Sequence, residues 1–299
     1  MLANSRVLAA DFDLITAHSL EEVLSLLATH GDHAALLFGG TDLLVQMKMG
    51  RRSSETVINC RWLEELKGIK EIGETLEIGA GSSLTQVGED ERVRREFPAL
   101  EDAILSIAGP AIRHMGTIGG NVVNASPAAD AVVALVAHRA RFRLQNQTGT
   151  RVVDSTEFFL GPGKTVRRPD EILTHILLAR PQGMSVSGHF RKVGRVAGDI
   201  AKLSVAVTAE KSLVGVVNWH VAMGSVAPTP VVLCEVEALL NHNRPLDGDI
   251  TSAIRATVAQ SITPIDDVRS TAWYRKRVSG VTVSDLCEQV WKEFEGGKA

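Results

Sequence analysis

Cysteine is scarce in this chain of 299 residues: Cys60, Cys234 and Cys287 are the only three, and no two of them stand in a CxxC pair. Iron–sulfur clusters and structural zinc sites are held by groups of cysteine thiolates at short spacings. Three scattered cysteines therefore indicate neither such a site nor a disulfide framework. We interpret each of them as a small residue of the core.

Long apolar runs and one-sided charge are also missing. No stretch approaches the roughly 18 continuous apolar residues of a membrane span, and residues 1–13 carry no basic segment followed by an apolar one, as a secretion signal would. The net charge is −3, with Lys and Arg spread among Asp and Glu. We predict a cytoplasmic globular protein with no membrane span and no nucleic-acid partner.

Familiar catalytic motifs are missing as well. The chain has no GxSxG nucleophile elbow, no HExxH zinc motif, no phosphate-binding GxxxxGK motif and no GxGxxG dinucleotide fingerprint. Its nine histidines do not pair at ligand spacing, and we interpret His114, His138 and His220 as structural residues. The sequence therefore predicts no catalytic side chain and no metal site.

Two Gly-Gly steps are the most informative feature that is present. The first lies in residues 37–44 (LFGGTDLL) and the second in residues 117–121 (TIGGN), and each follows an expected strand end. A Gly-Gly step permits positive φ and lets a ligand approach main-chain N–H groups without meeting a Cβ atom. Each step alone is most simply an ordinary tight turn. Together, the two predicted turns could hold one diphosphate.

The beginning of the chain has the pattern of a βαβ unit. Residues 19–30 form a predicted helix, because Ser19 and Glu22 have the spacing of a capping box and Gly31 follows the last apolar position. The elements expected after it are a strand at 34–38, a helix at 41–49 and a strand at 56–59.

The rest of the chain divides at residues 181–183 (PQG), where the pattern changes from short elements to long strands and helices. Before this boundary we expect strands at 76–79 and 171–179, a hairpin from 141–144 and 150–153, and a loop at 158–163. We also expect three helices: one that ends near residue 90, one at 99–108 and one at 131–137. After it we expect strands at 203–209 and 214–223, and helices at 232–240, at 249–260 and from near 284.

Six segments, in order, resemble one known family. They are residues 36–48 (LLFGGTDLLVQMK), 78–85 (IGAGSSLT), 112–130 (IRHMGTIGGNVVNASPAAD), 198–207 (GDIAKLSVAV), 223–230 (MGSVAPTP) and 266–275 (DDVRSTAWYR). The chain resembles the FAD-binding medium subunits of the molybdenum hydroxylases, the group that contains the carbon monoxide dehydrogenase flavoprotein and the flavin domain of xanthine dehydrogenase. Two features depart from that pattern: Pro110-Ala111 stands where Pro-Gln is usual, and residues 12–15 (FDLI) replace a Phe-x-x-Pro opening.

The resemblance implies an α+β fold. A two-subdomain PCMH-type FAD-binding domain, which is vanillyl-alcohol-oxidase-like, would occupy residues 1–181, with subdomains at about 1–60 and 61–181. Residues 182–299 would form a C-terminal α+β domain like that of the carbon monoxide dehydrogenase flavoprotein, with an antiparallel sheet and a helical bundle.

The resemblance also implies where FAD lies. The cofactor would extend between the two subdomains, and main-chain N–H groups of both Gly-Gly segments would hold its diphosphate without Lys or Arg. The residues implied for this clamp are Leu36, Leu37, Phe38, Gly39, Gly40, Thr41, Asp42, Leu43, Thr117, Ile118, Gly119, Gly120 and Asn121.

Further residues match cofactor contacts of that family. Asp130 matches an acid near the adenosine side, and the alternative is a plain N-cap of the following helix. Leu173 matches an apolar contact, and Lys192 or its neighbour Arg191 would lie near the cofactor. Ile200 corresponds to a residue at the isoalloxazine face, where some relatives have Tyr.

The implied activity is electron relay. FAD would take electrons one at a time from a [2Fe–2S] cluster in a small partner subunit and pass them to NAD, a quinone or O₂. Because this chain has neither clustered cysteines nor residues suited to molybdopterin, a large molybdopterin-containing subunit is implied too, in a dimer of heterotrimers. The substrate would bind on that other chain, so purines, aldehydes, carbon monoxide and N-heterocycles all stay open.

Two other interpretations stay open. A stand-alone flavoenzyme of the same superfamily would need a substrate pocket with a base or a covalent flavin anchor, for which His114 is the nearest candidate. A nucleotide-binding or scaffold protein without activity would use the Gly-Gly segments only structurally.

Overall fold

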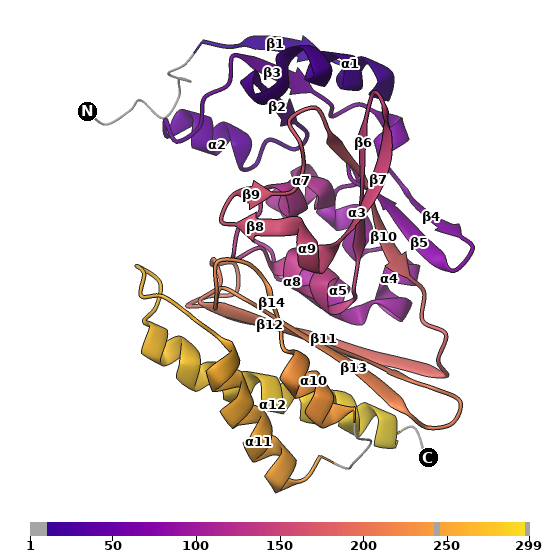
Figure 1. The fold of residues 1–299 in the computed structure, drawn as a ribbon, viewed down its shortest axis with the longest axis vertical. Coiled ribbons are helices and arrows are strands. Elements are labelled where there is room, and N and C mark those ends of the chain that lie inside the picture. Colours follow the sequence, from indigo (N-terminus) through magenta and orange to yellow (C-terminus); the bar gives the residue numbers. More distant parts are fainter. Residues whose placement is uncertain (1–10, 242–245, 297–299) are drawn as a thin grey trace.

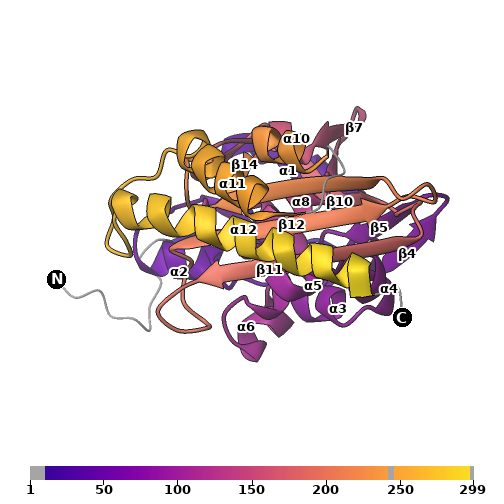
Figure 2. The same ribbon diagram turned by 90° about the horizontal axis from the view of Figure 1, so that it is seen from below.

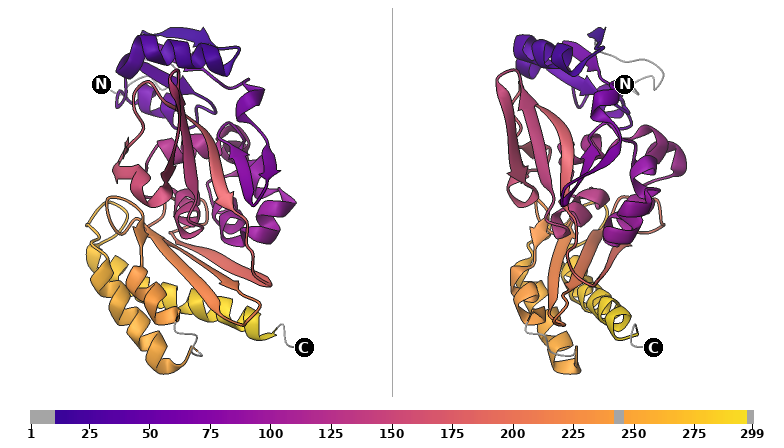
Figure 3. Two further views of the ribbon diagram at one scale, coloured as in Figure 1. Left: turned by 45° about the vertical axis from the view of Figure 1, so that its right-hand side comes forward. Right: turned by 90° about the vertical axis from the view of Figure 1, so that its right-hand side faces the viewer.

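The computed structural model describes residues 11–241 and 246–296. We refer to three parts: the N-terminal unit (11–66), the middle unit (67–181) and the C-terminal unit (182–241 and 246–296). They follow one another from top to bottom in Figure 1. The turned views in Figure 3 also keep the N-terminal and C-terminal units at opposite ends of the middle unit.

The N-terminal unit is a small parallel sheet with helices, as the predicted βαβ pattern requires. Its strands are β1 (Asp13–Thr16), β2 (Ala34–Leu37) and β3 (Thr56–Asn59), in the order β1-β3-β2, and its helices are α1 (Leu20–His30) and α2 (Leu43–Lys48), with 3₁₀ turns η1 (Gly31–His33) and η2 (Glu64–Leu66). Ser19 caps α1 by accepting the N–H of Glu22. The Glu22 carboxylate accepts the N–H of His18 rather than that of Ser19, so only half of the capping box forms.

The middle unit packs helices on an antiparallel sheet. The sheet order is β4 (Ile69–Ile72), β5 (Thr75–Gly79), β10 (Ile172–Ala179), β6 (Arg141–Asn146) and β7 (Gly149–Asp154). The helices are α3 (Leu84–Gly88), α4 (Glu91–Glu96), α5 (Pro98–Leu105), α6 (Pro110–Met115), α7 (Ile118–Val123), α8 (Asp130–Ala137) and α9 (Ser155–Phe158). Every residue of α8 is buried, which confirms the predicted core helix.

The C-terminal unit is a four-stranded antiparallel sheet with helices on one face. Its strands are β11 (Ser185–Val193), β12 (Leu203–Lys211), β13 (Val217–Gly224) and β14 (Val231–Val232), and its helices are α10 (Cys234–Leu240), α11 (Gly248–Ser261) and α12 (Ala272–Gly296). Figure 2 shows these helices lying across the sheet from below. Along β12, Val205 and Val207 pack toward these helices, whereas Ala206 joins the core of the middle unit on the opposite face.

Several expectations need correction. Residues 158–163 are not a plain loop, because Phe158 ends α9 and two short strands follow, β8 (Phe159–Gly161) and β9 (Lys164–Thr165). The strand β11 was not predicted. Helix α12 begins at Ala272 rather than near 284; buried Arg275 holds its first turns by donating to the Ile265 carbonyl and to Asp267, a tertiary contact that periodicity does not show.

The cysteines are only partly as predicted. Cys60 and Cys287 are buried in the core, but Cys234 is exposed because it starts α10 on the solvent side. Within residues 11–241 and 246–296, no helix has both the length and the apolar character needed to span a membrane.

His189 on β11 ties the C-terminal helix to the middle unit. Its Nδ1 lies 3.3 Å from Oδ2 of Asp102 in α5, and its Nε2 lies 2.6 Å from Oε1 of Glu293 in α12. The hydrogen bond to Asp102, supported by Glu293, raises the pKa of His189 against the opposing effect of burial. The protonated ring can donate to both carboxylates at once.

We therefore expect this contact to stabilise the fold more at low pH. A histidine whose pKa is raised on folding contributes stability that is fully present below its unfolded pKa of about 6.5 and is lost as pH rises through the folded value. The variant His189→Gln should lose that stability, so wild type and variant should differ most at acidic pH and converge at alkaline pH in urea unfolding. A difference that grows with pH would contradict the assignment.

Candidate cofactor-binding site

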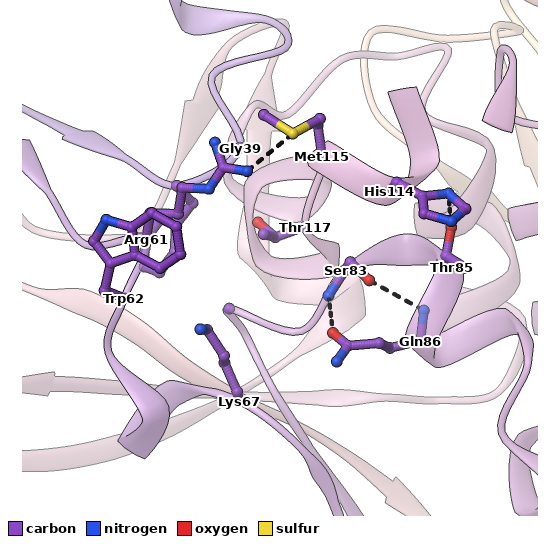
Figure 4. A pocket seen from close by; sticks show the side chains of 12 residues that line it. Gly39, Arg61, Trp62, Lys67, Ser83, Thr85, Gln86, His114, Met115 and Thr117 are labelled. Carbon is purple, nitrogen blue, oxygen red and sulfur yellow. Dashed lines mark hydrogen bonds between the residues drawn. The ribbon is translucent and has the colours of Figure 1, made fainter. Parts of the chain in front are cut away.

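A cavity of about 410 Å³ lies where the N-terminal and middle units meet. Figure 4 shows side chains from both units converging on it. Its size lies within the range of small-molecule sites. The residues that line it are Phe38, Gly39, Arg61, Trp62, Lys67, Gly81, Ser83, Thr85, Gln86, His114, Met115 and Thr117. Both Gly-Gly segments therefore contribute to one cavity, through Gly39 and Thr117.

The first Gly-Gly segment has the geometry of an anion cradle. Gly40 has φ +69°, a conformation that favours glycine, and a Cβ on Gly39 would collide with the Met115 carbonyl. Among the described residues, no acceptor is present for the main-chain N–H groups of residues 39–42. Unpaired N–H groups of successive residues are the arrangement that proteins use to bind phosphate oxygens.

The second Gly-Gly segment differs from what the sequence suggested. It is no tight turn but the start of α7, where Thr117 Oγ1 caps the helix by accepting the N–H of Gly120. The N–H of Ile118 donates to the Ser82 carbonyl at 3.0 Å and that of Gly119 to the Ala80 carbonyl at 2.9 Å. The N–H of Asn121 donates to the Thr117 carbonyl, so the main-chain N–H groups of residues 118–121 already have acceptors within the chain.

Close packing requires glycine at position 119. A Cβ there would lie 2.5 Å from the Cβ of Ala80 and 2.6 Å from its carbonyl oxygen. We expected Gly119 to leave room for a phosphate. In the structure its lack of a side chain instead allows α7 to pack closely against Ala80, which follows β5. What the segment offers a ligand is side-chain chemistry: Oδ1 of Asn121 is buried and has no hydrogen-bond partner.

Asp130 and Lys192 form a buried ion pair that joins the middle unit to β11. Lys192 Nζ lies 2.9 Å from Oδ2 of Asp130 and also donates to the Ser106 carbonyl, and both side chains are less than a tenth exposed. Burial raises the pKa of Asp130 to about 6, against the opposing effects of Lys192 and Ser106. The other oxygen, Oδ1, is buried without a partner. Asp130 is the first residue of α8 and does not cap it, so the N-cap alternative is wrong.

Because side chains alternate along a strand, Arg191 and Lys192 on β11 point to opposite faces of the sheet. Lys192 faces the middle unit, whereas Arg191 points to the opposite face, where its Nη2 lies 3.3 Å from Oε1 of Gln289 in α12. Leu173 is buried in the middle core, and Ile200 is 65% exposed in the loop between β11 and β12. Neither residue lines the cavity.

The remaining residues of the predicted clamp surround the first glycine turn. Leu36 and Phe38 pack against the N-terminal core, Thr41 Oγ1 lies beside Gly116, and Asp42 accepts a hydrogen bond from Gln46. Leu37 ends β2 and Leu43 begins α2.

Several lining residues were not predicted, including Arg61, Trp62 and Lys67. Arg61 and Trp62 follow the end of β3 after one intervening residue, Cys60, as the glycine turn comes just after β2. Strands β2 and β3 are parallel neighbours, so the residues that follow them lie at the same edge of the sheet, where such sheets bind ligands. The parallel pairing could therefore have identified Arg61 and Trp62 as candidate site residues. His114 also lines the cavity; its Nδ1 donates to the Pro110 carbonyl at 2.9 Å.

Comparison with known proteins identifies the class. Residues 10–181 match the family model described as the FAD binding domain in molybdopterin dehydrogenase, and residues 188–290 match the CO dehydrogenase flavoprotein C-terminal domain. This chain belongs to the family of FAD-binding subunits of the molybdopterin dehydrogenases.

Individual relatives agree with this class. The xanthine dehydrogenase FAD-binding subunit of Escherichia coli is 33% identical over 88% of this chain and 91% of its own length. The carbon monoxide dehydrogenase medium chain of Hydrogenophaga pseudoflava is 31% identical over 94% of this chain and 97% of its own. A solved carbon monoxide dehydrogenase structure from that organism has a chain that superposes with a TM-score of 0.90 at 30% identity, covering 95% of this chain and 98% of that one. The FAD cofactor, the oxidoreductase class and the α+β fold predicted from the sequence are thereby confirmed.

The two glycines of the second segment should respond differently to alanine. Gly119→Ala places a methyl group against Ala80 and should lower the free energy of unfolding by about 2 kcal/mol through overpacking. Gly120→Ala meets only Thr117 Oγ1, at 3.0 Å, and gains helix propensity, so its effect should stay within about 1 kcal/mol. Urea unfolding of the FAD-free chains measures both. Equal effects would contradict the packing described for α7.

Proposed function

We propose that this chain binds FAD across the junction of its N-terminal and middle units and relays electrons from a [2Fe–2S] partner subunit to an external acceptor. One observation carries the proposal: the N–H groups of residues 39–42 have no acceptor among the described residues, and the first of these residues, Gly39, lines a cavity that has no carboxylate in its lining. A dianionic diphosphate fits such a cradle. Bound FAD supplies the redox chemistry that the side chains of this chain lack.

The residues of the chain hold and orient the cofactor. The N–H groups of residues 39–42 donate to diphosphate oxygens. The buried oxygens of Asn121 and Asp130 that have no partner are acceptors for polar groups of the cofactor. Lys192 holds Asp130 in place from β11, and Leu173 and Ile200 are proposed as apolar contacts farther along the cofactor.

The proposal requires other chains. Within the described residues, no group of three or more His, Cys, Asp or Glu side chains could hold a metal ion. Relatives of this chain are named as a medium chain or an FAD-binding subunit. We infer a small [2Fe–2S] subunit and a large molybdopterin-containing subunit, in a dimer of heterotrimers in the cytoplasm. NAD, a quinone or O₂ would serve as the acceptor.

Purification with and without the partners tests this function. The chain alone should retain FAD and oxidise neither a purine, an aldehyde nor carbon monoxide. In the complex with both partners, one such substrate should bleach the flavin absorbance, and a complex without the iron–sulfur subunit should leave it oxidised. Turnover by the chain alone would favour a stand-alone oxidoreductase. A colourless chain that FAD cannot reconstitute would contradict both functions.

A further inference from the structure

Two segments at one end of the C-terminal sheet expose large apolar side chains. One is the loop between β11 and β12 (194–202), and the other leads into α12 and includes its first turns (262–277). We call them together the two-loop surface; it lies at the left-hand end of this sheet in Figures 1 and 2. Single exposed apolar residues are common, but a group of them marks an interaction surface. The exposed apolar side chains, each at least 65% accessible, are Val196, Ile200, Ile265, Val268 and Trp273.

Contacts between the two segments join them into one surface. Lys202 Nζ lies 5.4 Å from the centroid of the Tyr274 ring, which places the end of the first segment against the start of α12. Both segments also bond to the turn at residues 225–226, which follows β13. This turn accepts the N–H of Thr263 at 3.1 Å and donates to the Ala201 carbonyl at 3.4 Å.

The segment that leads into α12 is held firmly although its apolar side chains face solvent. Buried Arg275 donates to the Ile265 carbonyl at 3.0 Å and to Asp267 at 2.7 Å. Asp267 also accepts the main-chain N–H groups of Arg269 and Ser270. A loop that is already ordered loses little conformational entropy when a partner binds, so its exposed side chains are preorganised for contact.

The charge of the two-loop surface is opposite to that of the whole chain. Its two segments contain six Lys or Arg residues and three Asp residues, a formal net charge of +3, whereas the chain as a whole carries −3. Lys276 and Arg277 are exposed, and the Arg277 guanidinium lies 5.9 Å from the centroid of the Trp273 ring. A surface with an apolar centre and a positive rim is complementary to a partner with an apolar centre and a negative rim.

The position of the surface indicates what such a partner does. Ile200, which is proposed above as an apolar contact of the cofactor, belongs to it. A Cβ on Gly198 would lie 3.7 Å from the Ala108 carbonyl oxygen, so the same loop also adjoins the middle unit. A protein docked on this surface would stand beside the bound cofactor, where it could exchange electrons with it.

We propose that the two-loop surface docks a small acidic electron-carrier protein, which takes electrons from reduced FAD one at a time. This inference rests on the proposed function and goes beyond the small acceptors named there. Two carrier molecules, each reduced by one electron, would oxidise one FADH₂ to FAD, and the two protons would pass to water. Contacts between electron-transfer proteins are among the smallest protein interfaces, which fits a surface with five exposed apolar side chains.

The salt dependence of electron transfer to two carriers tests the inference. Stopped-flow absorbance, without oxygen, measures the second-order rate constant at which the reduced, FAD-loaded chain is oxidised by an acidic blue-copper protein and by a basic c-type cytochrome. From low to high salt, the rate constant for the acidic carrier should fall about tenfold, because salt screens the attraction to the positive rim. The rate constant for the basic carrier should rise. The net charge of −3 alone would predict the opposite for both.

Val268→Asp and Val214→Asp form a matched pair of variants. Val268 is fully exposed in the two-loop surface, and Val214 is 85% exposed in the turn between β12 and β13, at the other end of the sheet. Each change adds one negative charge to an exposed position, so FAD content and urea unfolding should equal those of wild type. Val268→Asp should lower the rate constant for the acidic carrier about tenfold at low salt, and Val214→Asp should leave it unchanged.

The outcomes separate the two proposals. A wild-type chain that does not retain FAD contradicts the proposed function itself. Retained FAD with equal effects of the two variants, or with an acidic carrier whose rate constant rises with salt, overturns the inference and leaves the function standing. If Val268→Asp releases the iron–sulfur subunit, or splits a dimer of this chain, in size-exclusion chromatography, the inference is also overturned, because a permanent partner would then cover the surface.

Discussion

The close approach of Gly39 to the Met115–Gly116 backbone is the contact on which the site depends. No side chain fits between these segments, because a Cβ on Gly39 would collide with the Met115 carbonyl. This contact sets the glycine turn after β2 against the end of α6 and closes the cavity between two units that have separate cores. The N–H groups of residues 39–42, which lie in this turn, have no acceptor among the described residues.

A second constraint attaches the C-terminal unit. The Asp130–Lys192 pair is buried, and removing one partner of such a pair leaves a costly unpaired charge. It therefore links α8 to β11 and at the same time keeps an unpartnered carboxylate oxygen in place. Polar contacts therefore hold the C-terminal unit to the middle unit at more than one place, since the Asp130–Lys192 pair acts together with the His189–Asp102 contact.

The elements that local chemistry specifies were predicted well. Strand β3 and the buried helix α8 follow from apolar patterning, and α1 follows from Ser19 and its apolar positions. Contacts between distant segments could not be predicted in this way. The N–H groups of Ile118 and Gly119 are paired with carbonyls of Ser82 and Ala80, and nothing within TIGGN indicates those partners.

In the candidate site, too, some residues could be predicted from the local sequence and others could not. The glycine turn after β2 was evident from its residues, and the resemblance to a family supplied Asp130 and Lys192. Trp62 and Lys67 belong to no motif, and they became candidates only when the fold placed them beside Gly39.

A crystal structure of the chain with FAD bound tests the central claim most directly. We predict diphosphate oxygens within hydrogen-bonding distance of the main-chain nitrogens of residues 39–42, with the N–H groups of Ile118 and Gly119 still bonded to Ser82 and Ala80. A diphosphate bound only by the main chain at the start of α7, with residues 39–42 making no contact to it, would contradict the account.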